Sequence, residues 1–167
     1  LSMLVSMMPM TFLKVWHMSN NSMLQYSTIE FASPEYDLAI KLRDKILRKP
    51  LNISFNAEDL AEEWDQIHIG GFDEVGKLLT VLVLKPVNEG TIKMRQVAVD
   101  DNQQGKGYGK SMVQFSEAWA KHNGYSIMEL HARDNAIPFY ISLDYKKLGK
   151  EFKEVGIPHF KMSKKLK

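Results

Sequence analysis

The sequence predicts a single α+β domain built on a mixed, mostly antiparallel sheet flanked by helices. Three observations lead to this prediction. The 167 residues suit one domain, which buries about two-thirds of its unfolded surface. Residues 23–167 contain no internal repeats, linkers or low-complexity segments. Within them, strand-like and helix-like patterns follow one another in an order that a layered α+β fold accommodates.

The first part of the chain differs from the rest, and we expect residues 1–22 to be a leader outside the fold. They are rich in methionine and show no clean period. No basic stretch precedes their apolar run, which argues against a secretory signal, and no segment reaches the roughly 18 apolar residues of a membrane span. The domain is therefore expected over residues 23–167, with no membrane partner.

The first strand and the first helix are expected at 24–31 and 34–48. Apolar and polar residues alternate over the strand. Ser33 supplies an N-cap, Pro34 suits the first helical position, and Pro50 ends the helix. One apolar helical face repeats every four residues through Leu38, Leu42 and Ile46.

The middle of the chain predicts a hairpin. A short helical turn is expected within 57–63 and a strand at 66–71. Two further strand-like runs, 77–86 and 91–99, flank the turn sequence VNEGT, so they are expected to pair.

A long helix is expected at 108–122, and Gly124 suits the residue that follows its end. One face of this helix carries Tyr108, Met112, Phe115 and Trp119. The remaining elements are expected to be a strand at 125–132, a short helix at 135–143, and strands at 146–154 and 159–166.

The composition is that of an ordinary soluble globule, with 44% apolar and 25% charged residues. The chain has no cysteine, which excludes disulfides, thiolate metal sites and a cysteine nucleophile, and suits the cytoplasm, where we expect the protein. The net charge of +2 argues against a general nucleic-acid binder. We interpret the lysine-rich segment 146–167 as a solvated edge strand and not as an RNA-binding surface, because lysines protect the edge of a sheet from further pairing.

A glycine-rich loop, QQGKGYGKS at 103–111, lies between a predicted strand and a predicted helix. Such a loop can bind phosphate, because the first amides of a helix have no internal partners and glycine allows close approach. Lys106 and Lys110 add positive charge. A pyrophosphate is the natural ligand, and a plain glycine turn at a helix start is the alternative.

Two familiar phosphate-binding patterns fail on spacing. A Walker A loop would need glycine at Gln104, and a dinucleotide fingerprint would need glycine at Lys110 or Met112. A third pattern, [QR]-x-x-G-x-[GA], fits as Gln104, Gly107 and Gly109.

Three segments resemble the GNAT superfamily of N-acetyltransferases, and the resemblance covers 24–167 in the correct order. MRQVAVDDNQQGKGYGKSMVQF resembles its acetyl-CoA-binding segment. NAIPFYISLDY resembles its N-x-x-A-x-x-F-Y-x-x-x-G-[FY] segment, except that Asn135 directly precedes Ala136 here. FKEVGIPHFKMSKKL resembles a subgroup with GIPH before the last strand, and RDKILRKPL fits the first helix of that subgroup. One departure is Asp144, where the family usually has glycine; aspartate tolerates the left-handed conformation expected there.

The resemblance implies acetyl transfer from acetyl-CoA to a primary amine by direct attack, without a covalent enzyme intermediate or a metal. It also implies a sheet splayed between the fourth strand, 91–99, and the fifth, 125–132. The coenzyme diphosphate would be held by the loop, its pantetheine arm by the fourth strand, and the developing oxyanion by a backbone N–H near Val99. The expected cofactor-binding residues are Val97, Ala98, Val99, Gln104, Gly105, Lys106, Gly107, Tyr108, Gly109, Lys110 and Asn135.

By family position, Tyr140 is expected to be the general acid for the leaving sulfur; a packed aromatic residue is the alternative. Glu129 and His131 share one face of the strand 125–132 and are candidate bases; the alternative is that they form a satisfied pair or face solvent. His159 is a further candidate. Arg43 and Arg133 could bind a substrate carboxylate or cofactor phosphates, and the sequence leaves this open.

The acceptor is expected to be a small-molecule or peptide amine, and the protein a monomer or homodimer. Two other functions remain open. One is an acetyl-CoA-binding sensor of the same fold without turnover. The other is a nucleotide-binding protein of another fold, which the failed spacings disfavour.

Overall fold

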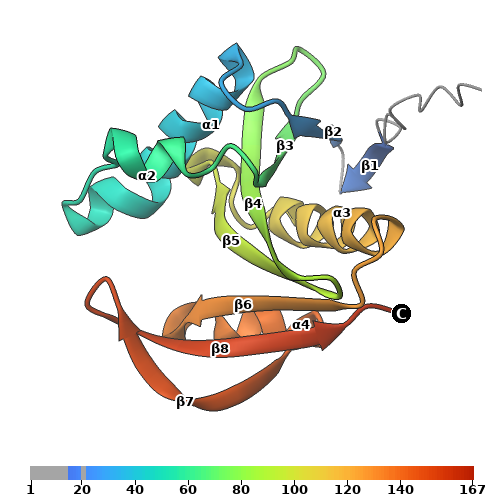
Figure 1. Cartoon of the computed structure of the whole chain (residues 1–167). Coiled ribbons are helices and arrows are strands. Elements are labelled where there is room, and N and C mark those ends of the chain that lie inside the picture. The colour runs from blue at the N-terminus through green and yellow to red at the C-terminus, as the bar shows by residue number, and fades with distance from the viewer. Residues whose placement is uncertain (1–14, 20–21) are drawn as a thin grey trace, which may run out of the picture.

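The computed structural model describes residues 15–19 and 22–167, and these form one α+β domain around a mixed sheet (Figure 1). The strand order is β1-β2-β3-β4-β5-β6-β8-β7, and every neighbouring pair is antiparallel except β5 and β6. The strands are β1 Val15–Ser19, β2 Ser22–Ile29, β3 Ile67–Phe72, β4 Leu78–Asn88, β5 Thr91–Val99, β6 Ile127–Arg133, β7 Lys146–Glu154 and β8 Ile157–Lys165. This arrangement confirms the predicted fold class.

The domain boundary predicted at residue 22 differs from the structure. Val15–Ser19 forms β1 and pairs with β2, from Val15 opposite Tyr26 to Ser19 opposite Ser22. Part of the expected leader is therefore an edge strand of the sheet. The physical reason is that β3 pairs with only one edge of β2. The backbone N–H and C=O groups along the other edge need partners, and β1 supplies them. Residues 1–14 lie outside the described residues.

The helix α1, Pro34–Arg43, begins as predicted. Ser33 accepts a hydrogen bond from the Tyr36 amide at 3.2 Å, and proline occupies the first turn. The chain then continues to coil as a π-helix, η1 Asp44–Arg48, and a 3-10 turn, η2 Lys49–Leu51. A second short helix, α2 Ala57–Ala61, is capped by Asn56.

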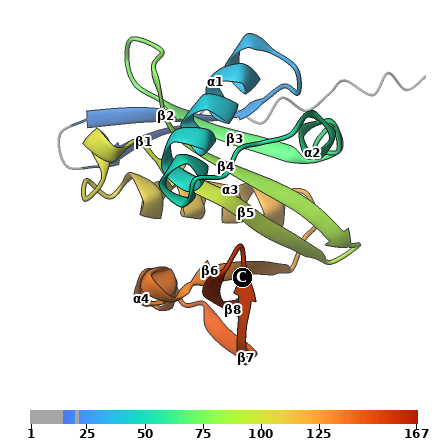
Figure 2. The same cartoon turned by 90° about the vertical axis from the view of Figure 1, so that its left-hand side faces the viewer.

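The long helix α3, Tyr108–His122, has the predicted bounds, and Gly124 follows it at φ +88°. It covers one face of the sheet, while α1 packs on the other, as Figure 2 shows. The short helices η4 Asp134–Ala136 and α4 Ile137–Ser142 follow β6. Asp144 then adopts φ +70°, the left-handed conformation expected of it. No helix within 15–19 and 22–167 is long and apolar enough to cross a bilayer.

The parallel pair β5–β6 separates partway along its length. Its register runs only from Thr91 opposite Ile127 to Met94 opposite Leu130. Beyond this point β5 carries a bulge, because Gln96 and Val97 intervene between the β5 residues that pair with Val83 and Val81 of β4. Gln96 has φ +51°. The bulge marks the point at which β5 leaves β6, so the splay predicted between strands 91–99 and 125–132 is confirmed.

Two further predictions of strand character hold. The residues of β6 alternate between buried and half-buried, with Met128, Leu130 and Ala132 packed in the core. His131 and Glu129 therefore share the opposite face, as their spacing predicted. Within the lysine-rich segment, β7 lies at the edge of the sheet and is almost wholly exposed, as predicted, whereas β8 lies between β6 and β7 and is not an edge strand.

Candidate active site

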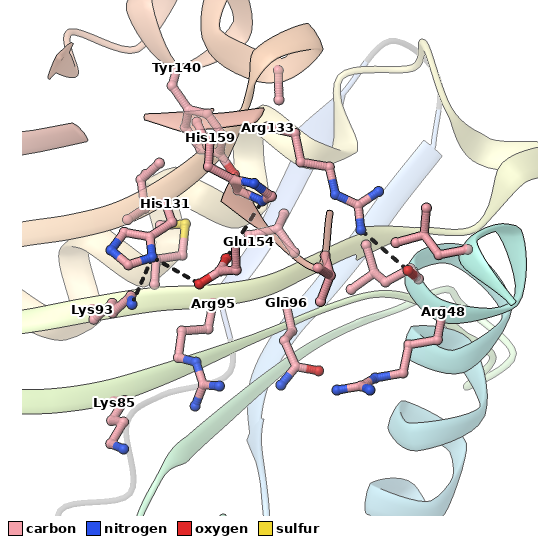
Figure 3. Close-up of a pocket in the computed structure, with 18 of the residues that line it drawn as sticks. Arg48, Lys85, Lys93, Arg95, Gln96, His131, Arg133, Tyr140, Glu154 and His159 are labelled. Atoms are coloured by element: carbon pink, nitrogen blue, oxygen red, sulfur yellow. Dashed lines mark hydrogen bonds and ion pairs between the residues drawn. The ribbon is translucent and has the colours of Figure 1, made fainter. Parts of the chain in front are cut away.

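A cleft of about 820 Å³ opens where β5 and β6 part. Its walls come from η1, the two strands of the β4–β5 hairpin, the end of β6, and the β7–β8 turn (Figure 3). The sequence-predicted residues Val97, His131, Arg133, Tyr140 and His159 all line it. The fold therefore brings together side chains that are up to 62 positions apart in the chain.

Tyr140 on α4 is 7% exposed and forms part of the cleft wall. Its ring packs edge-on against Phe139 and Tyr145, with centroid distances of 5.0 and 5.7 Å. Its hydroxyl makes no hydrogen bond to any residue that the structure describes. Burial raises the pKa of Tyr140 to about 12, so the hydroxyl is protonated at neutral pH and can donate to a ligand in the cleft.

A carboxylate lies between two imidazoles in the same cleft. Oε1 of Glu154 is 3.2 Å from Nδ1 of His131, and its Oε2 is 3.6 Å from Nε2 of His159 (Figure 3). Nδ1 of His159 lies 2.7 Å from the Ile157 carbonyl, to which it must donate a proton. His159 is therefore held in one orientation, with Nε2 directed at the carboxylate.

His131 has a second polar neighbour. Nζ of Lys93 lies 3.2 Å from the same Nδ1 atom. Nδ1 can therefore donate to Glu154 or accept from Lys93, depending on where the proton resides. Burial lowers the pKa of Lys93. The three groups form a short path along which a proton can move.

Glu129, the other base predicted from the strand, is not among the residues that line the cleft. Its carboxylate pairs with Lys161 on β8 at 3.2 Å. Glu129 is therefore held in an ion pair, but with Lys161 and not with His131. Periodicity placed Glu129 on the same face as His131, but two residues further from the splay.

The glycine-rich loop follows β5 and leads into α3. Gly105 and Gly107 adopt φ of +78° and +83°, and Gly107 is the N-cap of α3. In the part of the chain that the structure describes, the amides of Gln104, Gly105 and Gly107 donate no hydrogen bond. The amides of the first helical turn add further donors. Such a set of amides can bind an anion.

The other side chains of the loop differ in their contacts and in their exposure to solvent. Gln104 donates from Nε2 to the Val99 carbonyl at 3.1 Å, and Lys106 donates to Gln103 at 2.9 Å. Tyr108 is buried, so only its backbone can meet a ligand. Lys110 is exposed on α3.

The end of β5 exposes unpaired backbone to the splay. The amide of Asp100 donates to Leu79 of β4 at 2.9 Å. Because successive residues of a strand point in opposite directions, the N–H of Val99 points away from β4, towards the gap. Ala98 is buried, whereas Asn135 is exposed on η4 and does not line the cleft.

The sequence left the roles of Arg43 and Arg133 open, and the structure places only Arg133 in the cleft. Arg43 is fully buried and bonds to Glu63 at 2.6 Å and to Gln96 at 2.6 Å, so it holds the bulge of β5 rather than a ligand. Arg133 lines the cleft, with Nη2 3.3 Å from the Leu47 carbonyl.

Sequence reasoning did not single out Lys93 or Glu154. Lys93 lies within a strand pattern, and Glu154 lies just before a turn. Only the register of β6, β8 and β7 brings Glu154 to His131. No local signal in the sequence reports that register.

Known proteins resemble this chain in sequence and in fold. A family model described as an acetyltransferase (GNAT) domain matches residues 57–166. The chain is 28% identical over 127 residues to the uncharacterized N-acetyltransferase YjcF of Bacillus subtilis, covering 75% of this chain and 89% of that one.

Two solved structures have the same fold. An aminoglycoside 6'-N-acetyltransferase complexed with coenzyme A superposes with a TM-score of 0.71 at 16% identity, over 84% of this chain and 96% of that one. A GNAT family acetyltransferase from Elizabethkingia anophelis with acetyl-CoA bound superposes with a TM-score of 0.66 at 14% identity, over 86% of this chain and 98% of that one.

Proposed function

Because the chain belongs to the GNAT acetyltransferase family, we propose that it is an N-acetyltransferase that moves an acetyl group from acetyl-CoA to a primary amine by direct attack. The observation that carries this proposal is the splay between β5 and β6. It is bounded by Tyr140 and by Val97 of β5, and the glycine-rich loop follows the end of that strand.

The residues present fit acetyl-CoA as co-substrate. Amides of residues 104–109 would hold its diphosphate, with Lys106 and Lys110 adding positive charge. Asn135 would contact the coenzyme from η4. Backbone groups of Val97, Ala98 and Val99 would pair with the amides of the pantetheine arm, as an added strand pairs with a sheet edge. The two structural neighbours described with coenzyme A and acetyl-CoA support this assignment.

Two donors would serve the reaction itself. The Val99 N–H, which points into the splay, would stabilise the oxyanion, a contribution of about 3 kcal/mol at other acyl-transfer sites. The Tyr140 hydroxyl would donate to the leaving sulfur. A bare thiolate is unfavourable in the buried setting that raises the pKa of Tyr140, so a donor is needed there.

The acceptor must lose a proton before it attacks. An alkyl ammonium has a pKa of about 10.4, so exposing the lone pair at pH 7 costs about 4–5 kcal/mol. We propose His131 as the group that takes this proton, with Glu154 stabilising the imidazolium at 3.2 Å. His159 is the second candidate. Glu129 is not proposed, since it lies outside the cleft.

The test combines binding with turnover. Acetyl-CoA, but not ATP or NAD, should raise the melting temperature. Thiol release from acetyl-CoA should then require a primary amine. A raised melting temperature without thiol release in the presence of any amine would instead support a sensor that binds acetyl-CoA without turnover. An unchanged melting curve at more than about 1 mM ligand would count against both functions.

A further inference from the structure

The charge of the cleft is strongly one-sided. Among the described residues that line it there is one carboxylate, Glu154. The cationic side chains that line it are Arg48, Lys85, Lys93, Arg95 and Arg133. Figure 3 shows these side chains with the histidines and Tyr140. The cleft therefore carries an excess of positive charge beside the proposed reaction centre.

None of these five cations has a carboxylate within 4 Å among the described residues. Arg95 donates to the Gln66 amide oxygen at 3.2 Å, and Arg133 to a backbone carbonyl. Arg48 donates to the Ser54 carbonyl and stacks on Phe55 at 3.8 Å. Glu154 is already shared by two histidines. The neutral partners orient the arginines without neutralising them.

The cations are densest on the β4–β5 hairpin. Lys85 and Lys93 are direct cross-strand partners, and Arg95 lies two residues further along β5 on the same face. Like charges placed opposite each other destabilise a sheet. An anion between them would remove that cost.

We propose that the acceptor is a primary amine that also carries an anionic group, a carboxylate or a phosphate, bound by Lys85 and Arg95. This inference rests on the proposed acetyltransferase function. The amine would lie near His131 and Tyr140, and the anion towards the β4–β5 hairpin. Arginine and lysine form the strongest hydrogen bonds with such oxyanions.

These cations are poorly placed for the coenzyme phosphates. Arg95 precedes the bulge of β5, and the glycine-rich loop follows Val99. The four residues of extended strand between Arg95 and the end of β5 already span roughly 13 Å. The hairpin cations and the loop therefore define two separate anion sites.

The same charges favour the reaction. Cations near a bound ammonium lower its pKa, which increases the neutral fraction that can attack. They also attract an anionic acceptor and repel polycations, and salt screens both effects. Polyamines and aminoglycosides are accordingly expected to be poor acceptors.

The test compares amines matched except for the anion. O-phosphoethanolamine is paired with ethanolamine, and γ-aminobutyrate with butylamine, so that the two pairs distinguish a phosphate from a carboxylate. The anionic member of at least one pair should react with a kcat/KM at least about tenfold higher than its neutral counterpart. Lys85→Gln or Arg95→Gln should lower kcat/KM for that anionic amine by about tenfold to a hundredfold. Lys77→Gln, which removes an exposed charge outside the cleft, should change neither rate.

Calorimetric titration of the same amines into the wild type and the two variants gives a readout without turnover. Tighter binding of an anionic amine that is lost in Lys85→Gln or Arg95→Gln supports the inference even if no thiol is released, a result that would count against the transferase function alone. Equal binding of matched amines overturns the inference. So does a weakened affinity for acetyl-CoA in the two variants, because the cations would then serve the coenzyme.

Discussion

Glu154 on β7 places its carboxylate 3.2 Å from Nδ1 of His131 on β6, although β8 lies between these strands in the sheet. The contact is possible because Glu154 is the last residue of β7, beside the turn into β8. It orients the imidazole towards the cleft and gives it a negative partner when it is protonated. His131 and Glu154 therefore act as one proton-accepting unit in the proposed reaction.

Replacing His131 with Gln should lower kcat/KM by about a hundredfold at pH 7, since a base contributes about 10²–10⁴. The loss should shrink as the pH rises, because more of the acceptor is then already neutral. A pH–rate profile measures this. His159→Gln should keep most of the rate; a larger loss in His159→Gln than in His131→Gln would assign the base to His159.

Tyr140→Phe should lower kcat by at least about a hundredfold and leave the affinity for acetyl-CoA unchanged. The variant removes only the hydroxyl and keeps the ring packed against Phe139 and Tyr145. Steady-state kinetics and calorimetry separate the two effects. Tyr125→Phe, outside the cleft, is the control; equal turnover in Tyr140→Phe would remove Tyr140 from the mechanism.

Gly105→Leu should weaken acetyl-CoA binding by at least about tenfold, because a side chain there obstructs the loop amides. Gly76→Leu is a matched control: Gly76 has φ +82° against +78° for Gly105, and a Cβ meets nothing within 4 Å at either position. Both variants should lose about 1–2 kcal/mol of unfolding free energy from the left-handed backbone. Unaltered affinity in Gly105→Leu would discredit the diphosphate site.

Arg43→Met should cost about 3–5 kcal/mol of unfolding free energy, because it leaves the Glu63 carboxylate buried without its cation. Urea unfolding measures the loss. The double variant Arg43→Met, Glu63→Met should recover much of it, since replacing both partners of a buried pair is often neutral. A loss below about 1 kcal/mol in the single variant would contradict the role given to this pair.

The folded protein should lose stability as the pH falls below about 6.5. Burial lowers the pKa of His68, against the opposing effect of Glu63, so the unfolded chain takes up this proton first. Protonation would also place a proton on Nδ1, which is buried without a partner. Melting temperatures between pH 5 and pH 8 should show the loss, and His68→Gln should flatten it. An equal slope in both proteins would remove His68 as its cause.

Much of the fold could be predicted from local signals. Ser33 and Pro34 mark the start of α1, Gly124 marks the end of α3, and alternation identifies β6. The helix expected at 34–48 matches α1 and η1 together, and only η2 was missed, because Pro50 falls within the first turn of a 3-10 segment, where no amide is needed. Val15–Ser19 is a run of only five residues at the end of a methionine-rich segment without a clean period, so its pairing with β2 was also missed.

The site was only partly predictable. Motif spacing indicated the loop, which follows the end of β5, and Tyr140, which lines the cleft. Period-two alternation could not separate Glu129 from His131, because the bulge at Gln96 decides which of them reaches the cleft. Glu154 and the hairpin cations come together through strand register alone.

The most direct test of the account is thiol release from acetyl-CoA, followed together with mass spectrometry of the amine and of the protein. Thiol release is expected only when a primary amine is present, in equal amount to the acetylated amine, with no burst and no acetylated protein intermediate. An initial burst that acetylates the protein, or no release with any primary amine at saturating acetyl-CoA, would contradict it.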